Sequence, residues 1–133
     1  MAKKAAQHPK LRAGRPDTHH LHDPVVERAL DLIWSETPRP LSVSDIARRL
    51  PVTRRTLDRR FAELVGHSVL EEIVVCRMSR ATRLLRETEL PIKSVAHQSG
   101  FSSTERMRVA FIERVGLSPT AYRRQFDGAR RER

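Results

Sequence analysis

The chain has 133 residues, of which 38% are hydrophobic and 32% are charged, which suits one compact domain or two very small ones. Lysine and arginine number 26 against 16 aspartate and glutamate, and the net charge of +10 favours a polyanion such as nucleic acid or an anionic membrane surface. The single cysteine excludes an internal disulfide and a cysteine-rich zinc site.

Residues 1–22 are rich in basic residues, histidine, proline and glycine and show no periodicity, so we predict a flexible basic arm or linker there. They lack the apolar stretch of a secretory signal, and no apolar run in the chain approaches the ~20 residues of a membrane span. We therefore expect a cytoplasmic protein with no membrane partner. The histidines of THHLH at 18–22 admit a transition-metal site, but no fourth ligand lies nearby. Surface histidines in a linker are the favoured interpretation, and we expect no metal or other cofactor.

Helical periodicity predicts an all-α chain, beginning with a unit over residues 23–67. Asp23 is the expected cap of the first helix, followed by Pro24, and its buried stripe is Val26, Ala29, Leu30 and Ile33. Two more helices are predicted, separated by a turn at Pro51. The first is capped by Ser42 together with Asp45. The second begins at the cap residue Thr53, ends at Gly66, and buries Leu57, Phe61 and Leu64. An N-terminal helix followed by a helix-turn-helix unit is the predicted arrangement.

A linker helix is predicted over residues 68–88. It begins with a capping box of Ser68 and Glu71 and contains no glycine or proline. Its length would be ~28 Å. The expected apolar stripe consists of Leu70, Ile73, Val74, Met78, Ala81, Leu84 and Leu85.

The second half of the chain repeats the first. Five residues are identical, at an offset of fifty positions, between FAELVGHS at 61–68 and FIERVGLS at 111–118. The pair Val95-Ala96 corresponds to Ile46-Ala47 in the first half. We predict a second helix-turn-helix unit over 89–126, with a capping box of Ser102 and Glu105, a short last helix, and a basic tail at 127–133. The alternative is an ordinary helical bundle with chance similarity, but the matching identities and caps favour a duplication.

The second helix of a helix-turn-helix enters the major groove of DNA, and its early outward residues meet the bases. In the first unit these are Arg55, Asp58 and Arg59. Arginine can hold guanine, and aspartate can accept from the cytosine amino group. Arg54 and Arg60 are better placed for phosphates. The alternative is a solvated basic face in which Asp58 only pairs with a neighbouring arginine.

The corresponding outward residues of the second unit are Thr104, Glu105 and Arg108. Ser102 and Ser103 at the helix start offer hydroxyl and N–H groups to a phosphate. Because this helix is less basic, we expect weaker base reading and more backbone contact. Two reading helices on a strut of ~28 Å could occupy successive major grooves, ~34 Å apart, so that one chain reads an asymmetric site.

Residues 24–126 resemble the DNA-binding domain of the AraC/XylS family of bacterial transcription regulators. The resemblance is carried by Ile46-Ala47, TLDRRF at 56–61, Gly66-His-Ser, RMSRATRLL at 77–85, Val95-Ala96, Gly100-Phe101-Ser102 and GLSPTAYR at 116–123. The first reading helix and the Asp-Pro start are most similar to xylose-operon regulators. Met107 departs from the family, which commonly has an aromatic residue there, so we expect looser packing at that position.

The resemblance implies a seven-helix domain that binds double-stranded promoter DNA and usually activates transcription by contacting RNA polymerase. It also implies the same six base-reading positions. Family members usually carry a separate sugar- or signal-binding domain, so a sugar effector would act only through a sensor domain that is absent here. We expect the C-terminal piece of a longer regulator, with residues 1–22 as its linker, although a chain that acts alone is the alternative.

We do not expect an enzyme, because the sequence has no phosphate-binding glycine loop and no serine hydrolase pattern. A DNA-repair methyl acceptor needs an activated cysteine, and Cys76 lies alone within a predicted helix. The remaining alternative is an architectural protein that binds DNA by charge without sequence specificity.

Overall fold

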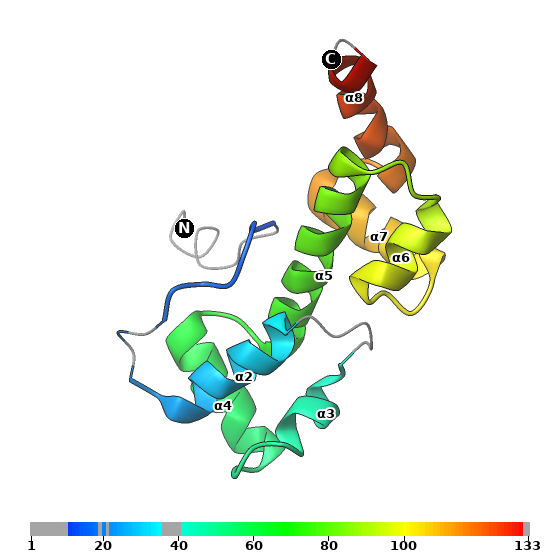
Figure 1. Cartoon of the computed structure of the whole chain (residues 1–133). Helices are drawn as coiled ribbons and strands as arrows, with labels where there is room; N and C mark the ends of the chain where they lie inside the picture. Colours follow the sequence, from blue (N-terminus) through cyan, green and yellow to red (C-terminus); the bar gives the residue numbers. More distant parts are fainter. Residues whose placement is uncertain (1–10, 19, 21, 36–40, 132–133) are drawn as a thin grey trace. The chain divides into compact units, whose positions relative to one another are not determined.

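The computed structural model describes residues 11–18, 20, 22–35 and 41–131, and all regular structure within these ranges is helical (Figure 1). The α-helices are α2 (Pro24–Trp34), α3 (Val43–Ala47), α4 (Arg54–Val65), α5 (Val69–Glu87), α6 (Ile92–Ser99), α7 (Thr104–Val115) and α8 (Pro119–Arg131). The chain divides into two compact units, and the boundary falls within α5 after Cys76. Unit 1 holds α2 to α4 and unit 2 holds α6 to α8, which confirms the predicted all-α pair of helix-turn-helix units.

The helix ends of unit 1 follow the predicted caps. Asp23 accepts hydrogen bonds from the first backbone N–H groups of α2, Ser42 and Asp45 form a reciprocal capping box at α3, and Thr53 caps α4. Gly66 ends α4 in the left-handed conformation at φ 97°, where a side chain would be strained. Only the length of α3 differs from expectation, because the chain leaves the helix after five residues and continues in turns to Pro51.

The core of unit 1 gathers the predicted inner faces of α2 and α4 around Leu30 and Phe61, both fully buried. The prediction that Leu70 belongs to the buried stripe of α5 is wrong, since it is 56% exposed. Val69 is fully buried instead, and Ile73 and Cys76 continue its row at helical spacing. The inward stripe therefore starts one residue earlier than the sequence predicts, which turns Leu70 by about 100° toward solvent.

Unit 2 repeats this plan with two differences in its caps and ends. Ser103, one residue after the predicted Ser102, caps α7 by accepting from the Arg106 N–H at 3.0 Å. Met107, where the sequence predicts looser packing, is fully buried. Ser118 caps α8, and this helix extends to Arg131 rather than ending in a basic tail at 127; residues 132 and 133 lie outside the described part.

Arg123 on α8 closes the C-terminal end of α5. Its guanidinium donates to the carbonyl oxygens of Leu85 (3.2 Å), Thr88 (3.2 Å) and Leu90 (2.7 Å). Carbonyls at a helix end and in the following loop have no helical N–H to pair with, so a side chain must satisfy them. One arginine therefore holds the start of the second helix-turn-helix unit against its last helix.

We predict that Arg123→Met lowers the free energy of unfolding of unit 2 by ~1–3 kcal/mol, because three carbonyls lose a charged donor. Hydrogen exchange at the amides of α6 and α7 measures this locally. Arg124→Met is the matched control, since Arg124 is exposed on the same helix and has no hydrogen bond or ion pair within the described ranges. Equal protection of the two variants would contradict the prediction.

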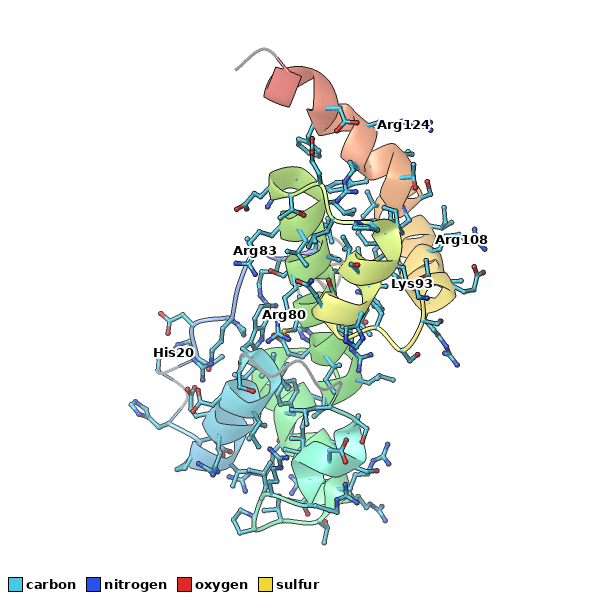
Figure 2. All side chains as sticks on the ribbon, turned by 45° about the vertical axis from the view of Figure 1, so that its right-hand side comes forward. His20, Arg80, Arg83, Lys93, Arg108 and Arg124 are labelled. Atoms are coloured by element: carbon cyan, nitrogen blue, oxygen red, sulfur yellow. The ribbon has the colours of Figure 1, made fainter. Side chains whose placement is uncertain are left out.

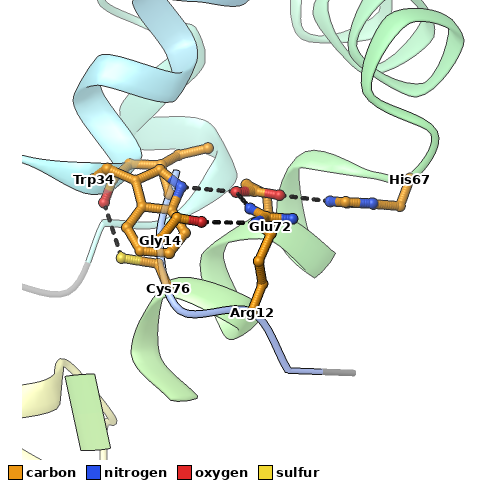
Figure 3. A network of polar contacts seen from close by, with 7 residues as sticks. Arg12, Gly14, Trp34, His67, Glu72 and Cys76 are labelled. Carbon is orange, nitrogen blue, oxygen red and sulfur yellow. Dashed lines mark hydrogen bonds and ion pairs between the residues drawn. The ribbon is translucent and has the colours of Figure 1, made fainter. Parts of the chain in front are cut away.

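Glu72, in the first turn of α5, is a fully buried carboxylate in the core of unit 1 (Figure 3). Its Oε1 is hydrogen-bonded to His67 Nε2 at 2.6 Å, and its Oε2 accepts from Trp34 Nε1 at 2.7 Å and from the Arg12 guanidinium. Burial alone raises the pKa of Glu72, but the hydrogen bonds from His67 and Trp34 and the charge of Arg12 outweigh it and lower that pKa from its ordinary value. Glu72 is thus held ionised inside the protein.

This lowered pKa predicts a pH dependence of stability. Ionised Glu72 contributes stability that is fully present above its unfolded-state pKa of about 4.5 and is lost as pH falls through the lower folded-state pKa. Urea unfolding of unit 1, followed by the fluorescence of Trp34, should therefore show a loss of stability below about pH 4.5. Glu72→Gln should flatten this acid dependence, and an unchanged slope in that variant would contradict the assignment.

Candidate nucleic-acid interface

The outward face of α4 brings together the three predicted base-reading residues of unit 1. Leu57 and Phe61 are fully buried, and their burial fixes the rotation of the helix about its axis. Arg55 and Arg59 are consequently exposed, and Asp58 is half-exposed beside them. The first turns of α4 thus present two arginines and an aspartate on one surface.

These side chains differ in how firmly the protein already holds them. Arg54 Nε lies 3.9 Å from Asp58 Oδ2 and its Nη1 donates to the Ser44 hydroxyl at 3.1 Å, while Arg59 Nη1 lies 3.6 Å from Glu63 Oε1, all on exposed surface. Exposed pairs at these distances contribute at most ~1 kcal/mol, so a DNA group can replace them. Arg55 has no hydrogen bond or ion pair within the described ranges. It is therefore the arginine of α4 that is most available to a ligand.

Arg60, predicted to contact phosphate, is bound by the protein itself. Its Nη2 and Nε donate to Asp23 Oδ2 at 2.6 and 3.0 Å, and Asp23 simultaneously caps α2. Burial raises the pKa of Asp23, but the hydrogen bonds from Arg60 and the Val26 N–H outweigh it and lower that pKa. Arg60 could meet a phosphate only by leaving this carboxylate, so its geometry favours a structural role that ties α4 to α2.

We predict that Arg60→Ala and Arg54→Ala have opposite signatures. Arg60→Ala should lower the unfolding free energy of unit 1 by ~1–3 kcal/mol, because Asp23 loses a charged partner, while the salt dependence of DNA binding stays unchanged. Arg54→Ala should leave stability nearly intact and reduce the slope of log K against log salt by ~1, as loss of one phosphate contact does. Urea unfolding and DNA titrations at several salt concentrations measure the two effects, and a reduced slope for Arg60→Ala would assign it to phosphate.

In unit 2 the predicted readers Glu105 and Arg108 bind each other. Arg108 donates through Nε and Nη2 to the two carboxylate oxygens of Glu105 at 3.0 and 2.7 Å. Accepting the hydrogen bonds of Arg108 lowers the pKa of Glu105, and donating them to Glu105 raises the pKa of Arg108. Thr104 is exposed at the first position of α7. The cap that we expected Glu105 to share belongs instead to Ser103.

Ser102 and Ser103, predicted to meet a phosphate, are both exposed beside the first turn of α7. The Ser103 hydroxyl already accepts the Arg106 N–H, but it keeps its own proton to donate. Sequence reasoning missed two exposed cations of this unit, Arg106 on α7 and Lys93 in the first turn of α6. Figure 2 shows Lys93 and Arg108 on the neighbouring ribbons of α6 and α7. The signal was present, because the buried positions of each helix leave Lys93 and Arg106 facing outward.

Each unit therefore places arginines and hydroxyl groups at the start of the second helix of a helix-turn-helix, the arrangement of a DNA-binding domain. Residues 46–125 match a family model described as a helix-turn-helix domain. No helix in the described part of the chain is long and apolar enough to cross a bilayer.

The chain belongs to the AraC-type helix-turn-helix family of transcription regulators. It is 38% identical over 104 residues to an AraC-like transcription regulator of Streptomyces lividans, an overlap of 78% of this chain and 34% of the relative. The chain spans about a third of the length of the curated relatives it matches.

Two solved structures show the same fold. One is the DNA-binding domain of AdpA, a global transcriptional factor, in complex with a target DNA, with TM-score 0.75 and 32% identity over 84% of this chain and 99% of that one. The other is the xylose-binding transcription activator XylR, with TM-score 0.66 and 26% identity over 80% of this chain and 28% of that one. The expected seven-helix domain of an AraC-type regulator is thus confirmed for the described residues.

Proposed function

We propose that this chain is the DNA-binding part of a transcription regulator and that it reads an asymmetric promoter site through α4 and α7. The observation that carries the proposal is the paired presentation of exposed arginines and hydroxyl groups at the start of both reading helices. The net charge of +10 favours the same polyanionic partner. The likeness to the AdpA domain, which was solved with its target DNA, supports the same conclusion.

We assign a role to each side chain from how firmly the protein already pairs it. Arg55 is unengaged, and Asp58 and Arg59 are only loosely paired, so these three supply most of the base reading. Thr104 and the bonded pair of Glu105 and Arg108 supply the second contact.

We assign phosphate contacts to Arg54 in unit 1 and to Ser102 and Ser103 in unit 2, and Arg106 and Lys93 join them as exposed cations of unit 2. Of the residues predicted to contact phosphate, Arg60 is the least available because its guanidinium is bound to Asp23.

We infer that the two reading helices enter successive major grooves. α5 is a continuous helix of 19 residues, ~28 Å long, and successive major grooves on one face of DNA lie ~34 Å apart. A single chain would then read two half-sites of different sequence without dimerising.

The finer role is that of an activator that contacts RNA polymerase, as the family resemblance implies. Because the matched relatives are about three times as long, we propose that an effector acts through a sensor domain outside this chain. A xylose-type sugar is the proposed effector, supported by similarity to a structure described as the xylose-binding activator XylR.

We predict that Arg55→Ala lowers affinity for the cognate site by ~1–3 kcal/mol and leaves affinity for random DNA nearly unchanged, because it removes a base contact. Selection from a random DNA pool supplies the cognate site, and titrations at one fixed salt concentration measure both affinities. Arg86→Ala, which removes an exposed arginine outside the reading helices, is the control for charge. Equal losses on both DNAs for Arg55→Ala would favour an architectural binder.

A further inference from the structure

Residues 11–18, here called the strap, are bound to unit 1 although we expected this part of the chain to be a flexible arm. Arg15 donates to Glu27 Oε2 at 2.7 Å and lies 3.3 Å from an Asp31 carboxylate oxygen. The Thr18 hydroxyl donates to the other Glu27 oxygen, and Thr18 is only 4% exposed. The strap thus lies along α2, held at two points by carboxylates of that helix.

Its third contact reaches the core. The Arg12 guanidinium binds Glu72, lies 5.7 Å from the centre of the Trp34 ring, and donates from Nε to the strap's own Gly14 carbonyl at 2.7 Å (Figure 3). An ionised carboxylate with no exposed surface is costly unless a charge and hydrogen bonds compensate it. Among the described residues bonded to Glu72, Arg12 alone carries a permanent charge. The strap therefore supplies a charge that the core of unit 1 requires.

The same carboxylate touches the end of the first reading helix. His67, bonded to Glu72 Oε1, follows Gly66 at the close of α4 and is 4% exposed. Its ring packs edge-on against Phe61 of α4, with the ring centres 6.3 Å apart. Direct contacts therefore run from Arg12 through Glu72 and His67 to the buried face of α4.

We propose that the strap is a conformational latch for the first reading unit. With Arg12 on Glu72, His67 is held and α4 keeps its reading geometry. When the strap leaves, Glu72 is a buried charge without its permanent partner, the His67 contact loosens, and DNA affinity falls although no DNA-contacting residue has changed. This inference rests on the proposed function, because a sensor attached ahead of the strap would send its signal to α4 by this route.

The test compares Arg12→Ala with Arg28→Ala in the full chain. Arg28 is the matched control, an exposed arginine of α2 with no hydrogen bond or ion pair within the described ranges. We expect Arg12→Ala to weaken binding to the selected DNA site roughly fivefold or more, the usual scale of coupling between sites. It should also speed hydrogen exchange in α4 but not in α7. Arg28→Ala should change neither the DNA affinity nor the hydrogen exchange of either helix. Arg12→Lys, which keeps the charge, should restore much of the affinity.

A double-mutant cycle shows whether the effect passes through Glu72. Arg12→Ala should change affinity little in a Glu72→Gln background, because the charge that it compensates is gone. Additive losses, or a less stable unit 1 that binds DNA as tightly as the unaltered chain at a temperature where both are folded, would overturn the latch. If Glu72→Gln does not fold, the comparison of Arg12→Ala with Arg12→Lys still decides. A chain that selects no DNA site at all would refute the proposed function, whereas a selected site bound equally by Arg12→Ala would refute only the latch.

Discussion

Both units depend on the burial of one apolar row along each reading helix. Leu57 and Phe61 in α4, and Met107 and Phe111 in α7, are fully buried at matching positions of the repeat. Because a helix is rigid about its axis, placing these residues in the core decides which residues face outward. The exposed arginines and hydroxyl groups at the helix starts are thus oriented by hydrophobic packing rather than by any contact of their own.

The duplicated frame carries two different surfaces. In α4 Arg55 is unpaired and Arg59 is only loosely paired within the described ranges, so their charge is available to DNA. In α7 Glu105 binds Arg108 through two hydrogen bonds, so part of the donor capacity is already used inside the protein. An arginine that is held by a neighbouring carboxylate, as Arg108 is, is already oriented before it meets a base, but it has fewer free N–H donors. The two units thus share one hydrophobic frame but present surfaces with different numbers of free donors.

Buried polar contacts join segments that the apolar core alone would not fix. Glu72 holds together the strap, the end of α2 and the turn after α4, while Arg123 ties the end of α5 to α8. Such groups are costly when left unpaired, so each makes its partners obligatory. A small domain can in this way specify the course of its loops with a few side chains. Loss of one partner has a larger effect than the number of contacts implies.

Local patterns in the sequence determined the helices, their duplication, most caps and the outward residues of α4, because apolar periodicity and capping chemistry act over three or four residues. Only the tertiary structure revealed the contacts between residues that are far apart in the sequence. The pairing of Arg60 with Asp23 and of Arg12 with Glu72 joins residues 37 and 60 positions apart, which no local pattern reveals. The residue that begins the buried row of α5 was also beyond local reasoning, because Val69 and Leu70 are both apolar and only the packed core chooses between them, whereas the predicted Ile73 is buried as expected.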